Sequence, residues 1–148
     1  MNLNIKRAVE EIRLSDDADS PVFYLDMNDI EMARKYNEMQ KKQRKFEVLQ
    51  GKLAEANGEE DQLVPIAKEC ATLLKDIITV CLGADACKQI VNYIKGDRRI
   101  PDYKITTYLC AVVVALMNLI KENYVEPLAD ISERAYVDQD KQPTITVI

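Results

Sequence analysis

The sequence predicts a mainly α-helical protein: a bundle of about four to five helices with a short N-terminal strand or hairpin. Apolar residues recur at helical spacing over most of the chain after residue 28. Gly58, Gly83 and Gly96 stand where these periodic stretches break, as glycines that end helices do. Near the amino terminus, Val22–Leu25 is rich in β-branched and aromatic residues, which favour a strand.

Length and composition are those of one globular domain. The chain has 148 residues, 47% of them apolar and 30% charged, with a net charge of −5. A disordered or collagenous chain does not have this profile, and the acidic balance argues against a broad nucleic-acid-binding face. We expect a single helical domain over residues 1–137 and a flexible tail over residues 138–148.

The amino-terminal segment leaves two structures open. Residues 1–13 have apolar positions at helical spacing, yet residues 9–14 would also suit a strand paired with Val22–Leu25. The other source of a partner strand is a second subunit. Ser15–Ser20 predicts a turn, and a calcium loop is disfavoured because its glycine and distal glutamate are missing.

A long helix is predicted to begin at Asn28 or Asp29, whose side chains can cap it, and to end near Ala56. It carries a seam in alternating steps of four and three, typical of a helix packed on another helix. The seam consists of Met32, Tyr36, Met39, Gln43, Phe46, Gln50 and Leu53. Its neighbour is either another helix of the chain or another subunit. The basic run at residues 41–45 is interpreted as a solvated face.

Two further helices are predicted between short connections. The second begins at about Glu59, runs to about Cys81 and forms an antiparallel hairpin with the first, because the loop at Gly58 is short. Gly83 ends it in a left-handed conformation, and Asp85 is predicted to cap a third helix over residues 86–95.

A fourth helix is predicted from Asp102 to about Asn123. It is apolar on nearly all sides between Tyr108 and Leu116, so we expect it at the centre of the core. Its most apolar part, residues 105–120, is shorter than the ~20 residues that span a bilayer, which indicates a buried helix and no membrane association. Glu126-Pro127 predicts the start of a fifth, short helix.

No pattern of a catalytic, cofactor or metal site emerges. The chain has no histidine, and its four glycines do not form a phosphate-binding loop. The four cysteines, Cys70, Cys81, Cys87 and Cys110, lie in apolar stretches and are interpreted as core residues. A carboxylate metal site assembled from several helices stays open as an alternative. The first fifteen residues have no apolar stretch typical of a secretory signal.

The order of these features resembles a known family. A β-prone segment, Tyr24–Asp29, precedes a long charged helix with Lys35-Tyr36, and an apolar helix ends in Ile77–Ala86 with a Leu-Gly-x-Asp element. Over residues 22–122 this layout is similar to the small tail assembly chaperones of long-tailed phages and prophages of Gram-positive bacteria. Met1–Leu14 and Val137–Ile148 have no counterpart in that family.

The resemblance implies a non-enzymatic, self-associating protein of the bacterial host cytoplasm. It would bind the tape-measure protein, keep it soluble and meet the tail-tube protein during tail assembly. The candidate protein-binding residues are Val22, Tyr24, Met32, Tyr36, Met39, Phe46, Arg98 and Arg99. Those of the seam are also the pattern of a helix packed internally. The alternative function is a helical regulatory or antitoxin-like protein that binds nucleic acid or an enzyme partner.

Overall fold

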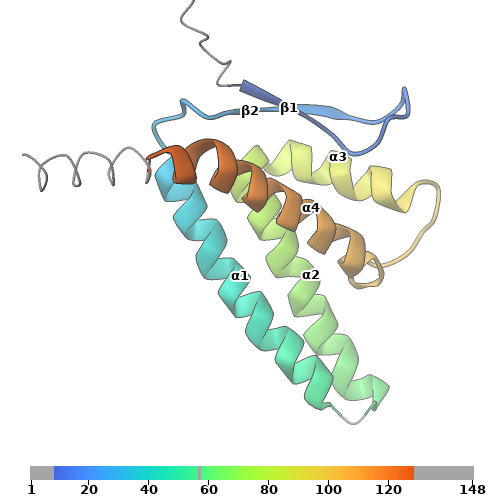
Figure 1. The fold of residues 1–148 in the computed structure, drawn as a ribbon. Coiled ribbons are helices and arrows are strands. Elements are labelled where there is room, and N and C mark those ends of the chain that lie inside the picture. The colour runs from blue at the N-terminus through green and yellow to red at the C-terminus, as the bar shows by residue number, and fades with distance from the viewer. Residues whose placement is uncertain (1–8, 57, 129–148) are drawn as a thin grey trace, which may run out of the picture.

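A computed structural model describes residues 9–56 and 58–128 and confirms the predicted fold class (Figure 1). An antiparallel hairpin is followed by four α-helices, with a 3₁₀ turn before the last helix and a π-helical turn after it. The elements are β1 (Val9–Arg13), β2 (Val22–Asp26), α1 (Met32–Glu55), α2 (Glu60–Leu82), α3 (Ala84–Lys95), η1 (Asp102–Ile105), α4 (Thr106–Ile120) and η2 (Lys121–Val125). The predicted tail and most of the predicted fifth helix lie outside the described residues.

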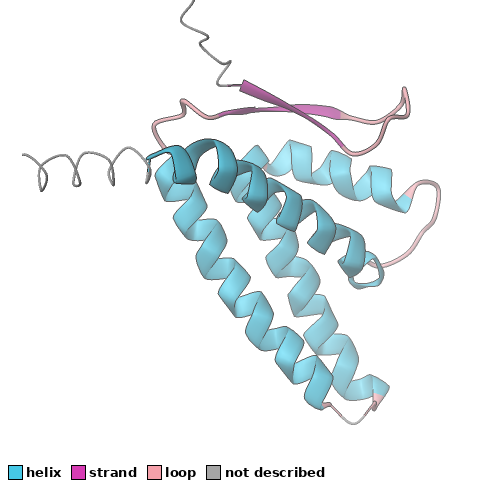
Figure 2. Ribbon diagram, in the orientation of Figure 1, coloured by secondary structure: helices cyan, strands magenta, loops and turns pink. Residues whose placement is uncertain are grey.

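The amino-terminal hairpin resolves the alternative between helix and strand for residues 9–13. β1 pairs with β2 of the same chain, with Ile12 opposite Phe23. Side chains of β2 alternate: Phe23 and Leu25 are buried, whereas Tyr24 between them is 67% exposed. The hydroxyl of Ser20 accepts hydrogen bonds from the amides of Leu14 and Ser15, the two residues that follow the first strand, which closes the turn. The hairpin lies across one end of the bundle (Figure 2).

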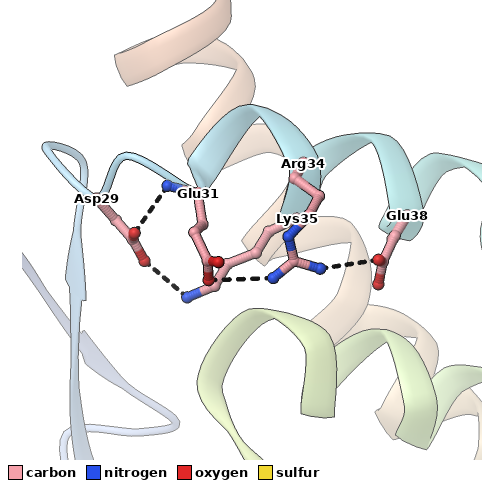
Figure 3. A network of polar contacts seen from close by, with 5 residues as sticks. All are labelled: Asp29, Glu31, Arg34, Lys35 and Glu38. Atoms are coloured by element: carbon pink, nitrogen blue, oxygen red, sulfur yellow. Dashed lines mark hydrogen bonds and ion pairs between the residues drawn. The ribbon is translucent and has the colours of Figure 1, made fainter.

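The start of α1 corrects the predicted cap. The helix begins at Met32, and Asp29 accepts a hydrogen bond from the amide of Glu31 and another from the ammonium of Lys35 (Figure 3). These hydrogen bonds, first that from Lys35, lower the pKa of the Asp29 carboxyl. Asp29 therefore shapes a turn before the helix, because an aspartate side chain readily bonds the amide two residues on. Arg34 then bridges Glu31 and Glu38 along the helix surface.

The seam of α1 packs inside the chain. Met32 and Met39 are fully buried and Phe46 is 5% exposed, all within one hydrophobic core shared with α2. α1 and α2 form the predicted antiparallel hairpin, the longest feature of the molecule (Figure 1). The neighbour of the seam is therefore α2, a helix of the same chain, and not another subunit.

The prediction that the fourth helix occupies the centre of the core is wrong. α2 holds that place, since it contacts α1, α3, α4, η1 and β2. Six of its residues are buried, including Leu74, Ile77 and Ile78. α4 is more apolar than α2 and has no charged residue, but it packs on the bundle with one side only, leaving Tyr108 and Val114 exposed. The apolar composition of a helix indicates how much free energy its burial could contribute, but not which of its sides contacts a neighbour.

Helix boundaries after α2 also differ from the prediction. α3 begins at Ala84 directly after Gly83, so Asp85 lies in its first turn and does not precede it as a cap. Gly83 has φ 98° and ψ 164°, a positive φ as predicted but an extended conformation in place of the left-handed helical one. Only glycine adopts this conformation readily, and it joins two helices through a single residue.

The predicted fourth helix is longer than expected and absorbs the start of the fifth. A continuous helical stretch runs from Asp102 to Leu128, with 3₁₀ geometry at its start and a π-helical turn at Lys121–Val125. Glu126 and Pro127 therefore continue this stretch instead of opening a new helix. The π-helical turn changes the hydrogen-bonding pattern of the backbone locally, and the helix continues beyond it.

Two glycines provide a matched test of this backbone. Gly51 lies inside α1 with open space around its α-carbon, so Gly51→Ala should stabilise the protein by about 0.5–1 kcal/mol by favouring the helix. Gly83→Ala should destabilise it by about 1–3 kcal/mol because alanine is strained at a φ of 98°. Urea denaturation followed by circular dichroism measures both changes. Equal effects of the two substitutions on the free energy of unfolding would contradict the requirement for glycine at the positive φ of residue 83.

Candidate functional site: the uncharged face of α4

α4 presents an uncharged face to solvent. No Asp, Glu, Lys or Arg occurs from Ile105 to Ile120. One side of the helix enters the core through Leu109, Val113, Leu116, Met117 and Ile120. On the other side Tyr108 is 60% exposed and Val114 is 44% exposed, and Ala111 and Ala115 are exposed beside them. The outer side of a surface helix is ordinarily charged or polar, and exposed apolar patches mark interaction sites.

A groove runs between α4 and α1. It has a volume of about 610 Å³, and α1 contributes Phe46 and Gln50 to its lining. From α4 it is lined by Thr106, Thr107, Cys110, Ala111, Val114, Ala115 and Asn118. None of these side chains is charged, so the groove suits an apolar ligand with few polar groups.

A second groove lies between α4 and β1, with a volume of about 410 Å³. β1 and the residue after it contribute Glu11, Ile12, Arg13 and Leu14, and α4 contributes Ala111, Val112, Ala115, Leu116 and Leu119. Ala111 and Ala115 line both grooves. Their small side chains form a low ridge, which allows the backbone of a partner to approach α4 closely.

A third groove of about 580 Å³ lies between α1 and α2, away from α4. It is lined by Val48, Leu49, Thr72 and Leu73 together with the charged residues Lys45, Lys68 and Glu69. Long charged side chains cover apolar surface with their methylene groups while keeping their charges in water. The lining of this groove is also mainly apolar, and it differs from the face of α4 in carrying charged side chains.

The helical stretch that contains α4 also satisfies the length and composition of a membrane-spanning helix. Asp102–Leu128 has 27 residues, and its most apolar window has a mean hydropathy of 1.6 with 33% of that window buried. The core helix of a water-soluble protein passes the same test. Five side chains of α4 are buried against the bundle, so only one side of this helix is exposed. The expectation of a buried helix holds for only one of its sides.

An ion-pair cluster holds the start of this face in place. Asp102 in η1 accepts hydrogen bonds from the ammonium groups of Lys75 in α2 and Lys95 at the end of α3. The hydrogen bond from Lys75, followed by that from Lys95, lowers the pKa of the Asp102 carboxyl, although partial burial opposes this shift. One carboxylate thus ties together three elements at the point where the chain enters α4.

The cysteines fit the interpretation as core residues at three of four positions. Cys70, Cys81 and Cys87 are buried. Burial raises the pKa of the Cys81 thiol to about 12 and also raises that of Cys70, which keeps both thiols protonated and unreactive. Cys110 differs because it is partly exposed in the α1–α4 groove. Within residues 9–56 and 58–128, no three His, Cys, Asp or Glu side chains gather as metal ligands.

The residues predicted to bind protein are dispersed over the fold. Met32, Met39 and Phe46 are buried in the core, so in this fold they stabilise the monomer; Met32 and Met39 have no exposed surface, whereas Phe46 is 5% exposed. Tyr36 and Val22 are half-buried, whereas Tyr24, Arg98 and Arg99 are exposed. Arg98 donates hydrogen bonds to the carbonyls of Ile94 and Lys95 and so caps α3. Of the eight residues, Phe46 is the one that lines any of the three grooves.

Sequence reasoning missed the exposed residues of α4. The sequence predicts that Tyr108, Ala111, Val114 and Ala115 lie in the core, because a helix without charge is usually buried. The periodicity offers a weak signal: Thr107, Ala111, Ala115 and Asn118 are small or polar and recur in steps of four, four and three along one side. Such a stripe separates one side of the helix from the side that carries the large apolar residues, but it does not show that the side with small or polar residues is exposed to solvent.

The Asp102 cluster predicts a pH dependence of stability. Its folded-state pKa lies below the ordinary value of 3.8, so its contribution is present above pH 3.8 and is lost as the pH falls through the folded-state pKa. Asp102→Asn should lower the free energy of unfolding by about 1 kcal/mol at pH 7 and flatten its decline below pH 4. Denaturation curves from pH 7 to pH 2 measure this. Asp76→Asn, an exposed carboxylate of α2 without an ion pair among the described residues, is the control; a parallel decline in wild type and Asp102→Asn would refute the coupling.

Comparison with known proteins gives no relative from which a function can be transferred. Protein-family models, curated protein sequences and solved structures yield no match to the chain.

Proposed function

We propose that this protein is a non-enzymatic binding protein that holds an apolar segment of another protein on the exposed face of α4. The observation that carries the proposal is the combination of no charge from residue 105 to residue 120 with solvent exposure of Tyr108 and Val114. Exposed apolar surface on a helix invites association, because contact with a partner removes that surface from water at roughly 25 cal/mol per Å².

An amphipathic helix is the partner element that best suits the α1–α4 groove. The groove is open and elongated along α4, and the ridge of Ala111 and Ala115 leaves room for a neighbouring backbone. A helix can lay its apolar stripe into such a groove, with anchors at every third or fourth residue. Val114 would pack against those anchors, and Gln50 and Asn118 at the groove could bond to polar groups of the partner.

The most specific form of this proposal is a phage tail assembly chaperone. The order of features over residues 22–122 resembles that family, and an exposed apolar helix is suited to a long helical client such as the tape-measure protein. In this role the protein acts in the host cytoplasm, self-associates and releases its client as tail-tube protein polymerises. The proposal assigns no catalytic step and no cofactor to the chain.

A helical regulator or antitoxin-like protein is the second candidate. Exposed Arg98 and Arg99 in the loop between α3 and η1 could pair with phosphate or with an acidic partner. The observations favour it less, because Arg98 already caps α3 and the chain carries a net charge of −5. Salt separates the two functions: phosphate binding weakens steeply as ionic strength rises, whereas apolar binding on α4 does not.

Co-expression tests the proposed client. The chain is produced together with a tape-measure protein as the candidate client, and solubility, co-purification and light scattering are measured. A soluble stoichiometric complex, with the client precipitating when expressed alone, is the expected result. A client whose solubility is indifferent to this chain would remove the tail-assembly form of the proposal.

Val114→Glu tests the site on α4. Val114 is 44% exposed, so glutamate can keep its charge in water in the free protein, whereas in a complex that charge would be buried. We expect client affinity to fall at least tenfold with little change in stability. Ile30→Glu is the matched control, because Ile30 is 96% exposed and lies outside the grooves described above. Equal affinities of the two variants would show that the client binds elsewhere.

Cys110 offers an independent readout in the unmodified protein. It is the one cysteine of the four that is not buried, and it lines the α1–α4 groove. Client bound in this groove should slow the reaction of Cys110 with a thiol reagent at least tenfold. An unchanged rate in a saturated complex would place the client outside the groove.

A further inference from the structure

β1 has an open edge within the described part of the chain. It pairs with β2 on one side, and the hairpin is a two-stranded sheet among the described residues. The groove beside it is lined by four consecutive residues, from Glu11 to Leu14. Glu11, Ile12 and Arg13 belong to β1, and Leu14 follows it. Successive side chains of a strand point to opposite faces, so a groove lined by three consecutive strand residues runs along the edge of the strand and not beneath one face.

The two walls of this groove differ in chemistry. β1 offers backbone amides and carbonyls at its open edge, and α4 offers the apolar side chains of Val112, Leu116 and Leu119. An extended segment satisfies both walls if its backbone pairs with β1 and its alternate side chains are apolar. A helix could not, because its own backbone groups are already bonded internally.

The chain itself contains a segment of this kind outside the described residues. Thr144–Ile148 consists of β-branched residues at all five positions, and β1 is also five residues long. Ile145 and Val147 alternate with Thr144 and Thr146, so one face of a strand here is apolar, and the other carries both threonines and ends in Ile148. Pro143 precedes the segment, and proline is tolerated at the first position of a strand.

The connection is long enough to reach the groove. Leu128, the last described residue, is nine residues beyond Leu119 in the groove lining, which corresponds to about 14 Å along a helix. Residues 129–143 separate Leu128 from the segment, and these 15 residues can span up to about 50 Å when extended. The chain can therefore turn back along α4 and bring Thr144 beside β1.

We propose that Thr144–Ile148 pairs with the open edge of β1 as the third strand of the sheet and fills the β1–α4 groove of its own chain. Ile145 and Val147 then cover the apolar side of α4, and Thr144 and Thr146 face water. The added strand covers an edge that would otherwise be open to pairing with other chains. This site is distinct from the α1–α4 groove of the proposed function and does not depend on it.

Amide hydrogen exchange of β1, measured by NMR on the isolated protein, tests the proposal. Alternate amides of β1 face β2, and the others face the open edge. In the full chain we expect the edge-facing amides to be protected. Truncation after Gln142, or the double substitution Ile145→Asp and Val147→Asp, should speed their exchange at least tenfold while the amides facing β2 keep their rates. The matched control is Thr144→Asp with Thr146→Asp, which should retain protection.

Equal exchange of the edge-facing amides in the full and truncated chains would overturn the proposal. Loss of protection at every amide of β1 would also overturn it, since that result indicates an unfolded hairpin and not an uncovered edge. Dilution distinguishes the source of the strand: protection that is independent of concentration supports pairing within one chain. Protection that falls on dilution would assign the strand to a second copy and refute the intramolecular arrangement.

Discussion

The burial of α2 among its neighbours is the constraint on which the rest of the structure depends. α1, α3, α4, η1 and β2 all contact this helix. Full burial of a leucine or isoleucine side chain such as Leu74 or Ile77 contributes roughly 1.5–3 kcal/mol, so the apolar stripe of α2 supplies much of the energy that holds the bundle together. Each other element needs only one apolar side to join the core, and this leaves their outer sides free for solvent or for partners.

Polar groups then fix directions that apolar packing leaves undetermined. Gly83 allows α3 to leave α2 after a single residue, and Asp102 joins both of these helices to the start of α4 through two lysines. The hairpin covers one end of the bundle through Phe23 and Leu25. As a consequence, one side of α4 packs on the core. Its exposed side lies between α1 and β1, with a groove toward each of them. The two grooves of the candidate site follow from this placement.

The two grooves beside α4 differ in what they can bind. The α1–α4 groove is uncharged and has side chains on both walls, which suits a helix of a partner protein. The β1–α4 groove has a backbone edge on one wall, which suits an extended segment. The ridge of Ala111 and Ala115 belongs to both, so a helix in one groove and a strand in the other would lie on either side of the same short side chains. Both proposals thus arise from the absence of charge on α4.

The sequence by itself determined that α1 to α4 are helices, that a strand begins at Val22 and that glycines separate the helices, because periodicity, β-branched residues and the conformational freedom of glycine are local properties. It also indicated that Met32, Met39 and Phe46 form one stripe. Only the tertiary structure decided that this stripe packs on α2, that residues 9–13 pair with β2, and that α4 is exposed on one side. Those outcomes depend on which apolar surfaces contact one another. The hydrophobic effect is non-directional, so a helix that is apolar enough for the centre of a core can equally lie at its edge.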